Sequence, residues 1–155
     1  MYNYEAKVTW ARKKDEIFTD QKYSREHKIS FESGLIIDGS PSGHIVPVPH
    51  SNPNFLDPEQ AFVAALSCCH MLFFLDLCSR EGIVIDDYAD DAIGELKRIG
   101  RNKMAMTKVT LRPQARYSGE NIPTNHKLEE LHHRAHELCY IANSVTSEIV
   151  TEIIS

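Results

Sequence analysis

The sequence predicts an α+β protein, in which antiparallel sheets surround one long apolar helix. A nearly continuous apolar run over residues 58–81 carries helix signals at both of its ends. The segments with strand character lie before this run and between it and a second helical segment near the C-terminus. They do not alternate with helices in βαβ order, and this clustering favours an α+β fold.

The first third of the chain is expected to hold two strands. Glu5–Trp10 and Ile29–Ile37 show alternation and β-branched residues, which are typical of strands. The polar segment Asp15–Arg25 between them is expected to be an extended connection. Glycine and proline recur through Asp38–Leu56, and this composition predicts a loop.

The start of the long helix has a clear physical signature. Asp57 can cap the helix, and Pro58 occupies the first helical position, where its missing N–H costs nothing. Glu59 in the first turn is favourable against the helix dipole, and Gly82 ends the helix. We therefore expect a helix from Pro58 to about Glu81.

This helix is apolar on nearly every face, so it should be buried all round. Its length of roughly 24 residues would suit a membrane span. Four polar residues interrupt it, however, and a central core helix is the better interpretation (Glu59, Gln60, His70 and Asp76). Burying such a helix within one domain of 155 residues is difficult. A core shared by two copies would bury it, so we expect a homodimer.

The remainder of the chain is expected to alternate strands with one more helix. Asp91–Arg98 and Met104–Tyr117 are predicted strands, joined by a turn at Gly100–Asn102. Leucine and alanine recur at helical spacing from His126 to about Cys139, and Ser147–Ile154 alternates as a final strand.

Composition narrows the class of protein. The net charge is −5 and charged residues make up 25% of the chain, without a basic stripe for nucleic acid. Met1–Trp10 alternates polar and apolar residues instead of forming the apolar block of a signal peptide. The four cysteines lack the regular spacing of a secreted disulfide framework. We expect a cytoplasmic protein with no membrane segment, in which a disulfide would be catalytic rather than structural.

The cysteines differ in what they can do. Cys69 and Cys78 face opposite sides of the predicted helix, and a helical backbone keeps the neighbours Cys68 and Cys69 from joining. A useful disulfide must therefore involve Cys139, 70 residues beyond Cys69. Buried cysteines are mostly small hydrophobic residues, and this is the favoured interpretation of Cys68 and Cys78. For Cys69 and Cys139 the sequence pattern favours neither interpretation: an inert core cysteine and a redox-active cysteine are equally compatible with it.

Three motifs resemble those of the OsmC/Ohr family, the osmotically inducible and organic-hydroperoxide-resistance proteins. Residues 57–60 (Asp-Pro-Glu-Gln), followed by Ala64-Ala65 and Cys69, resemble the family's first cysteine motif. Residues 135–139 (Ala-His-Glu-Leu-Cys) resemble its second motif, and Ser24-Arg25-Glu26 resembles the loop that carries the family's arginine. The similarity runs from about Tyr4 to the C-terminus, which suggests a single OsmC-like domain over residues 1–155.

The resemblance implies an intertwined α+β homodimer and a thiol-dependent peroxidase that reduces organic hydroperoxides in the oxidative stress response. It implies Cys69 as the peroxidatic thiol, Cys139 as the resolving thiol, and Arg25 and Glu59 as the pair that activates the chemistry. It also implies an external dithiol reductant of lipoyl type. No cofactor and no metal are expected.

The chemistry explains why such residues are needed. An ordinary cysteine is only about 3% thiolate at pH 7, and burial disfavours the thiolate further. Cys69 is about three turns into its helix, too far for the helix dipole to help much. Arg25 can supply a cation, because its charge survives desolvation. Glu59 can hold the guanidinium in a bidentate pair, and the same cation would stabilise the departing oxygen.

The sequence departs from the family pattern at three places. Tyr140 follows Cys139 where the family usually has proline, Cys68 stands beside Cys69 where alanine or serine is usual, and the segment before Arg25 is longer. If Arg25 does not reach the site, Arg12 and Arg80 are the alternative cations, although a surface role is favoured for both.

Two other functions remain in competition. His132, His136 and Cys139 lie on one stripe of the second helix, and with Cys69 or His70 they would suit zinc. We favour a solvated helix surface for His132 and His133, and a core position beside Cys139 for His136. The other alternative is a non-catalytic dimeric stress or binding protein with inert thiols. A pocket lined by Phe62, Leu66 and Phe73 is possible, but core packing is favoured for each.

Overall fold

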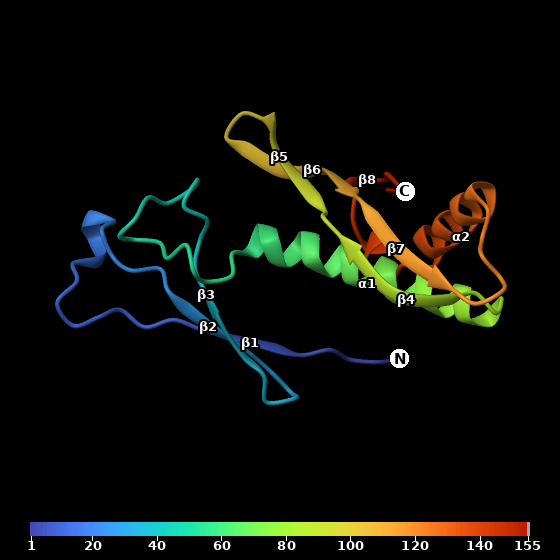
Figure 1. Ribbon diagram of the computed structural model, residues 1–155. Coiled ribbons are helices and arrows are strands. Elements are labelled where there is room, and N and C mark those ends of the chain that lie inside the picture. The colour runs from blue at the N-terminus through green and yellow to red at the C-terminus, as the bar shows by residue number, and fades with distance from the viewer. Residues whose placement is uncertain (155) are drawn as a thin grey trace. The chain divides into compact units, whose positions relative to one another are not determined.

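The computed structural model describes residues 1–154. The chain divides into two compact units, Met1–Ala61 and a second unit that begins at Phe62, so the boundary falls in the first turn of the long helix. The elements have an α+β arrangement, as predicted: mostly antiparallel sheets and one long central helix (Figure 1).

The first unit contains a three-stranded antiparallel sheet in the order β1-β2-β3. Its strands are β1 (Ala6–Thr9), β2 (His27–Phe31) and β3 (Ile36–Gly39). The prediction of one strand over Ile29–Ile37 is wrong, because this segment is a hairpin. Gly34 has φ +85°, a conformation that favours glycine, and the turn around it pairs Ile29 with Ile37.

The predicted extended connection Asp15–Arg25 is also wrong, because this segment folds back on itself. It contains the short 3-10 helix η1 (Phe18–Asp20). The Phe18 ring stacks on Tyr23 with ring centroids 4.6 Å apart, and both rings contact Trp10. The Trp10 indole N–H donates a hydrogen bond of 2.8 Å to the carbonyl of Ser24. Aromatic packing therefore gives this polar segment an ordered shape.

The loop after β3 leads into helix α1 (Pro58–Arg80), whose bounds confirm the prediction. The Gln60 N–H donates a hydrogen bond of 2.8 Å to Oδ1 of Asp57, so Asp57 caps the helix as expected. At the other end Gly82 has φ +70°, and the Ile83 N–H bonds to the carbonyl of Cys78.

The second unit contains two sheets and a second helix. Strands β4 (Val84–Asp90) and β7 (Pro113–Ser118) form an antiparallel pair. Strands β5 (Ile93–Gly100), β6 (Lys103–Leu111) and β8 (Glu148–Thr151) form the other sheet, in which β8 runs parallel to β6. Helix α2 (Asn125–Leu138) and the 3-10 helix η2 (Ala142–Ser144) precede β8.

Two strand predictions in this unit need correction. Strand β4 was not predicted, because a bulge between Ile85 and Asp87 interrupts its alternation. The predicted strand Met104–Tyr117 is two strands that pair in different sheets, β6 with β5 and β8, and β7 with β4. The turn at Gly100–Asn102 is confirmed, with Asn102 at φ +58°.

The core of the second unit lies along one side of α1. Phe74, Leu77 and Cys78 of α1 pack against Leu131 and Ala135 of α2. Leu66 of α1 packs with residues of β6 in a separate cluster (Val109 and Leu111). Helix α1 thus packs against both α2 and β-strands of its own unit (Figure 1).

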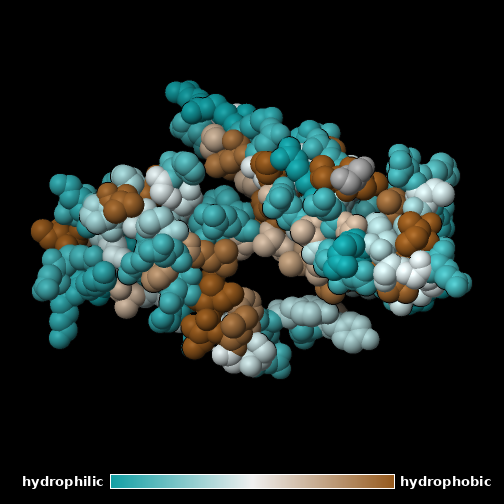
Figure 2. Space-filling model, viewed as in Figure 1, coloured by the Kyte–Doolittle hydropathy of each residue, from teal (hydrophilic) through white to brown (hydrophobic). Residues whose placement is uncertain are grey.

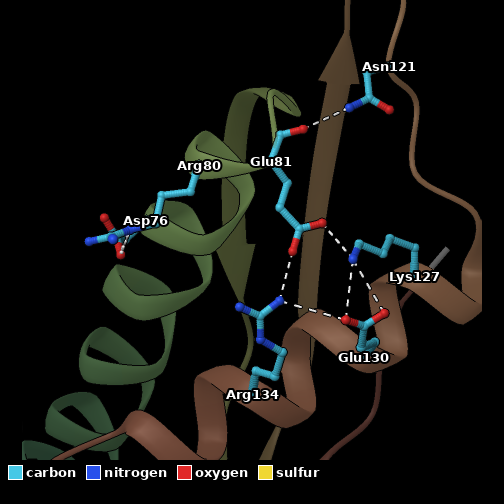
Figure 3. Close-up of polar contacts among 7 residues, drawn as sticks. All are labelled: Asp76, Arg80, Glu81, Asn121, Lys127, Glu130 and Arg134. Atoms are coloured by element: carbon cyan, nitrogen blue, oxygen red, sulfur yellow. Dashed lines mark hydrogen bonds and ion pairs between the residues drawn. The ribbon is translucent and has the colours of Figure 1, made fainter.

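A polar network closes the C-terminal end of α1 against α2 (Figure 3). Glu81 accepts from Nη1 of Arg134 at 2.7 Å and from Nζ of Lys127 at 2.5 Å. Both cations also lie within ion-pair distance of Glu130, and the Asn121 amide donates to the Glu81 carbonyl. Several charges that share partners in this way hold the helices more firmly than one surface ion pair would.

Much apolar surface is not covered within the chain. All four residues of β1 are exposed, and Leu72 on α1 is 63% exposed. In the first unit, Figure 2 shows hydrophobic side chains at the surface around the three-stranded sheet, where Phe31, Leu35 and Ile36 are exposed. Helix α1 is also long and apolar enough to cross a membrane, judged by length and composition alone. The prediction that α1 is buried all round is therefore not met within a single chain.

Candidate active site

The thiols of Cys69 and Cys139 lie together between α1 and the end of α2. Cys69 is half-buried on α1, and Cys139 is the residue that caps the C-terminus of α2, with 1% of its surface exposed. The Cys69 side chain contacts Cys139 closely enough to affect its ionisation. The structure thus brings together the two cysteines that the sequence singled out.

The surroundings of Cys139 keep it protonated. Burial is the main cause that raises the pKa of its thiol to about 11, and hydrogen bonding with the Cys69 side chain raises it further. The Ala142 N–H acts in the opposite direction, because it points at the sulfur from 3.4 Å and favours the thiolate. Cys139 is therefore a neutral thiol at neutral pH, placed beside a donor that can stabilise it when it ionises.

The other two thiols have different surroundings. Cys68 is exposed on α1, although the sequence favoured a buried position for it. Cys78 is buried among Phe74, Leu77 and Leu131, and burial raises the pKa of its thiol to about 11. Cys78 is thus a core residue, as predicted. All four cysteines are unpaired in the structure.

The predicted activating residues Arg25 and Glu59 both lie in the first unit. The Arg25 guanidinium donates hydrogen bonds to the carbonyls of Tyr23 and Gln21, at 2.9 and 3.0 Å, and lies over the Tyr23 ring. Glu59 is half-buried in the first turn of α1. Among residues 1–154, no ion pair joins these two side chains. Their catalytic role stays a prediction.

The alternative cations have surface partners. Arg12 donates to carbonyls of its own loop, including that of Glu16, and Arg80 forms an ion pair with Asp76 one turn earlier on α1 (Figure 3). Tyr140, which replaces the proline of the family pattern, is exposed and meets the Phe73 ring edge-on at 5.0 Å. Leu66 is buried in the core, while Phe62 and Phe73 are partly buried.

The structure contains a buried pair of histidines, His70 and His132, which the sequence suggested only as possible metal ligands and not as partners of each other. Nε2 of His70 lies 2.9 Å from Nδ1 of His132, and both side chains are almost fully buried. The prediction that His132 lies on a solvated surface is wrong, whereas His133 is exposed as predicted, within 3.6 Å of Glu137. A signal was present, since His132 falls on the same stripe of α2 as Leu128, Leu131 and Ala135.

Burial keeps both histidines neutral. It is the main cause that lowers the pKa of His70 to about 4, and His136 nearby lowers it further, while Asp90 acts in the opposite direction. Burial likewise lowers the pKa of His132 to about 3, assisted by His70. Neutral imidazoles are good metal ligands, but in the described part of the chain no three histidine, cysteine or carboxylate side chains gather as a metal site would require.

Comparison with known proteins identifies the family. Residues 51–154 match the family model described as OsmC-like protein. A solved OsmC-like protein of unknown function from Vibrio cholerae O1 biovar eltor is 51% identical, with a TM-score of 0.97 over 99% of this chain and 100% of that one. No curated protein matches significantly.

More distant structures share the fold. An organic hydroperoxide resistance protein from Legionella pneumophila is 18% identical, with a TM-score of 0.70 over 99% of this chain and 96% of that one. A second from Vibrio cholerae, with captopril bound in one active site, is 17% identical, with a TM-score of 0.70 over 99% and 90%. That one such domain spans residues 1–155 stays a prediction. The family match over two thirds of the chain and the 51% identical relative show that this protein belongs to the OsmC-like family.

Proposed function

We propose that this protein is a thiol-dependent peroxidase that reduces organic hydroperoxides with Cys69 and Cys139. The observation that supports it most is the contact between these two thiols, which lie 70 residues apart in the sequence. Membership of a family that includes organic hydroperoxide resistance proteins points to the same substrate class.

The exposure of the two thiols and the raised pKa of Cys139 suggest which thiol reacts first. Cys139 is buried and its pKa is raised, so it presents little thiolate to a peroxide. Cys69 is the member of the pair that solvent can reach. We therefore assign Cys69 as the peroxidatic thiol and Cys139 as the resolving thiol.

The proposed reaction has three steps. The Cys69 thiolate attacks one oxygen of the hydroperoxide, the O–O bond breaks, and an alkoxide leaves and takes up a proton as the alcohol. Cys69 becomes a sulfenic acid. The Cys139 sulfur then attacks the Cys69 sulfur, an S–S bond forms, and the hydroxyl leaves as water with the Cys139 proton. An external dithiol, which we expect to be of lipoyl type, reduces the disulfide by exchange and is oxidised in turn.

We also propose that Arg25 and Glu59 form the pair that stabilises the Cys69 thiolate and the departing alkoxide. A guanidinium can stabilise both negative charges in turn. In the structure two backbone carbonyls and the Tyr23 ring hold the Arg25 side chain.

We also propose a homodimer in the cytoplasm. Only five residues of α1 are buried although its apolar residues surround it, and β1 is exposed throughout. A second copy would cover such surface. Light scattering coupled to size exclusion would test the dimer, with about 35 kDa expected, twice the 17.6 kDa of one chain.

The proposed cytoplasmic location is supported by the four unpaired thiols, which suit a reducing compartment.

Intact mass spectrometry tests the two-cysteine reaction. The reduced protein is treated with one equivalent of cumene hydroperoxide, or of hydrogen peroxide for comparison. We expect the wild type to lose two hydrogens, with the organic peroxide reacting faster. Cys69→Ser should not react, and Cys139→Ser should stop at a sulfenic acid that a cyclic 1,3-diketone traps. Cys68→Ser is the matched control and should behave as wild type. Absence of oxidation in the wild type would instead favour a protein with inert thiols.

A further inference from the structure

The His70–His132 pair connects α1 and α2, the two helical segments that carry the candidate thiols. His70 follows Cys69 directly on α1. His132 precedes Cys139 by seven residues, which is close to two helical turns, so both lie on nearly the same face of α2. Each histidine is thus connected to one of the cysteines through the backbone of its own helix, and the His70–His132 bond joins the two helices about two turns of α2 before Cys139.

The geometry of the pair is specific. The two imidazole planes are parallel within 1°, with centroids 5.2 Å apart, and one nitrogen of each ring faces the other at 2.9 Å. The Phe74 ring stacks on the face of His132, at 3.9 Å and 6°. His132 therefore has its edge fixed by His70 and its face fixed by Phe74, one turn further along α1.

A buried atom without a partner indicates which histidine donates. Nδ1 of His70 is buried and has no hydrogen-bond partner among the described residues. If His132 were the donor, neutral His70 would carry its proton on Nδ1, as a buried N–H with no acceptor. An orphaned buried N–H is rarer than an orphaned acceptor, so the favoured arrangement has His70 donating from Nε2 to Nδ1 of His132.

Such a bond fixes the helices in a way that apolar packing does not. Contacts between side chains such as Leu77 and Leu131 tolerate small shifts of one helix along the other. A hydrogen bond weakens steeply with distance and angle, and in a buried site its loss leaves polar atoms unpaired. The pair consequently opposes sliding or rotation of α2, which would carry Cys139 away from Cys69.

We propose that the hydrogen bond between His70 and His132 positions Cys139 against Cys69 and so controls how fast a Cys69 sulfenic acid becomes a disulfide. This inference rests on the two-cysteine function proposed above. The histidines are positioning residues: they take no part in bond making. The S–S bond forms and water leaves as already described, only more slowly when the pair is broken.

Two substitutions of His132 separate positioning from bulk. His132→Asn keeps an acceptor oxygen close to the place of Nδ1, whereas His132→Gln keeps the polarity but moves the amide to the place of Nε2. His133→Gln is the matched control, one residue away and exposed. Rapid-quench mass spectrometry with cumene hydroperoxide would measure sulfenic acid formation and disulfide formation separately.

We expect His132→Gln to slow disulfide formation about tenfold, the effect of losing one buried hydrogen bond. Formation of the sulfenic acid should stay within twofold of wild type, and excess peroxide should yield more sulfinic acid. His132→Asn and His133→Gln should stay close to wild type in both steps. Equal slowing by Asn and Gln, or equal slowing of both steps, would overturn the proposal, since either would indicate general damage to packing.

A measurement without peroxide separates this proposal from the peroxidase function. Glutathione redox buffers report the equilibrium between the two thiols and the Cys69–Cys139 disulfide. We expect His132→Gln to lower the equilibrium constant for forming the disulfide about tenfold and His132→Asn to preserve it. If the wild type does not react with hydroperoxide, but the equilibrium constant still falls in His132→Gln and not in His132→Asn, the peroxidase function is wrong and the positioning role stands. If the wild type reduces hydroperoxide but the difference is absent, the positioning role is wrong.

The reciprocal substitutions of His70 keep the test decisive if His132→Gln does not fold. His70→Gln places an amide N–H at the position of Nε2, so it should preserve both the disulfide rate and the glutathione equilibrium. His70→Asn withdraws that donor and should lower both about tenfold. Equal disulfide rates and equal glutathione equilibria in His70→Gln and His70→Asn would contradict the proposal.

Discussion

The Ser67 hydroxyl donates a hydrogen bond of 2.6 Å to Oδ2 of Asp90. The other carboxylate oxygen of Asp90 accepts from the Arg112 N–H, also at 2.6 Å. One carboxylate at the end of β4 thus connects the turn of α1 that carries Cys68 and Cys69 to the junction between β6 and β7.

Replacing Asp90 should therefore loosen the second unit. In Asp90→Ala, a hydroxyl and a backbone N–H lose a charged acceptor in a half-buried site. Hydrogen bonds to charged groups contribute about 1.5–3 kcal/mol, so we expect the free energy of unfolding to fall by about 3 kcal/mol. Urea denaturation at fixed protein concentration measures this. Asp91→Ala is the control, because Asp91 is exposed, and it should change stability by less than about 0.5 kcal/mol.

The buried histidines predict a loss of stability in acid. Their pKa values are about 4 and 3 in the folded protein and 6.5 when unfolded. Between these values the unfolded chain binds more protons, so stability falls as the pH falls below 6.5. From pH 7.5 to 5.5 each histidine should cost about 1.4 kcal/mol, or about 3 kcal/mol together.

Urea denaturation at pH 7.5, 6.5 and 5.5 measures this dependence. His132→Asn should remove about half of it, because only one titrating group of the pair remains. His133→Asn should keep the wild-type dependence, since His133 is exposed. A wild-type slope equal to that of His132→Asn would show that the pair is not the source of acid sensitivity.

Alkylation should separate the four thiols into two classes. Cys78 and Cys139 are buried, and their raised pKa values, about 11, leave very little thiolate at pH 7.5. Cys68 and Cys69 are accessible to different degrees. With iodoacetamide and peptide mass spectrometry, we expect Cys68 and Cys69 to be modified at least tenfold faster. Early modification of Cys139 would contradict the burial on which its assignment as the resolving thiol rests.

The proposed role of Arg25 and Glu59 predicts slower reaction with hydroperoxide. Loss of a group that stabilises the departing oxygen typically costs 10²–10³-fold, so Arg25→Gln should slow sulfenic acid formation by about that factor. Glu59→Gln should have a smaller effect in the same step, because it acts by orienting the guanidinium. Arg80→Gln is the matched control, since Arg80 pairs with Asp76 at the surface. Wild-type rates in Arg25→Gln would assign the activating cation elsewhere.

Local signals predicted the helices well. The cap at Asp57, Pro58 at the first position and Gly82 at the end gave the bounds of α1 almost to the residue, because they act within one turn of the backbone. Strands were predicted less well. Met104–Tyr117 divides into two strands because β6 pairs with β5 and β8 while β7 pairs with β4, and both β4 and β8 are distant from this segment in sequence. The bulge in β4 likewise arises from its pairing with β7.

The candidate site likewise has parts that the sequence predicted and parts that only the packing of the helices decided. Motif spacing drew attention to Cys69 and Cys139, and amphipathic periodicity placed α2, because these patterns are written locally in the chain. Which side of α2 meets α1 was decided only by the packing of Phe74, Leu131 and Ala135. That packing buried His132, turned it toward His70 and left Cys68 exposed beside Cys69.

The sequence by itself thus determined the family and the two helices, and it drew attention to Cys69 and Cys139, since each of these depends on residues close together or on a recognisable motif. Tertiary structure alone decided the strand pairing, the neutral state of the histidines and the raised pKa of Cys139. These properties depend on which distant groups exclude water from one another. Residues that are neighbours in space but distant in the chain cannot be identified from local sequence patterns. They become neighbours only when α1, α2 and the sheets pack together.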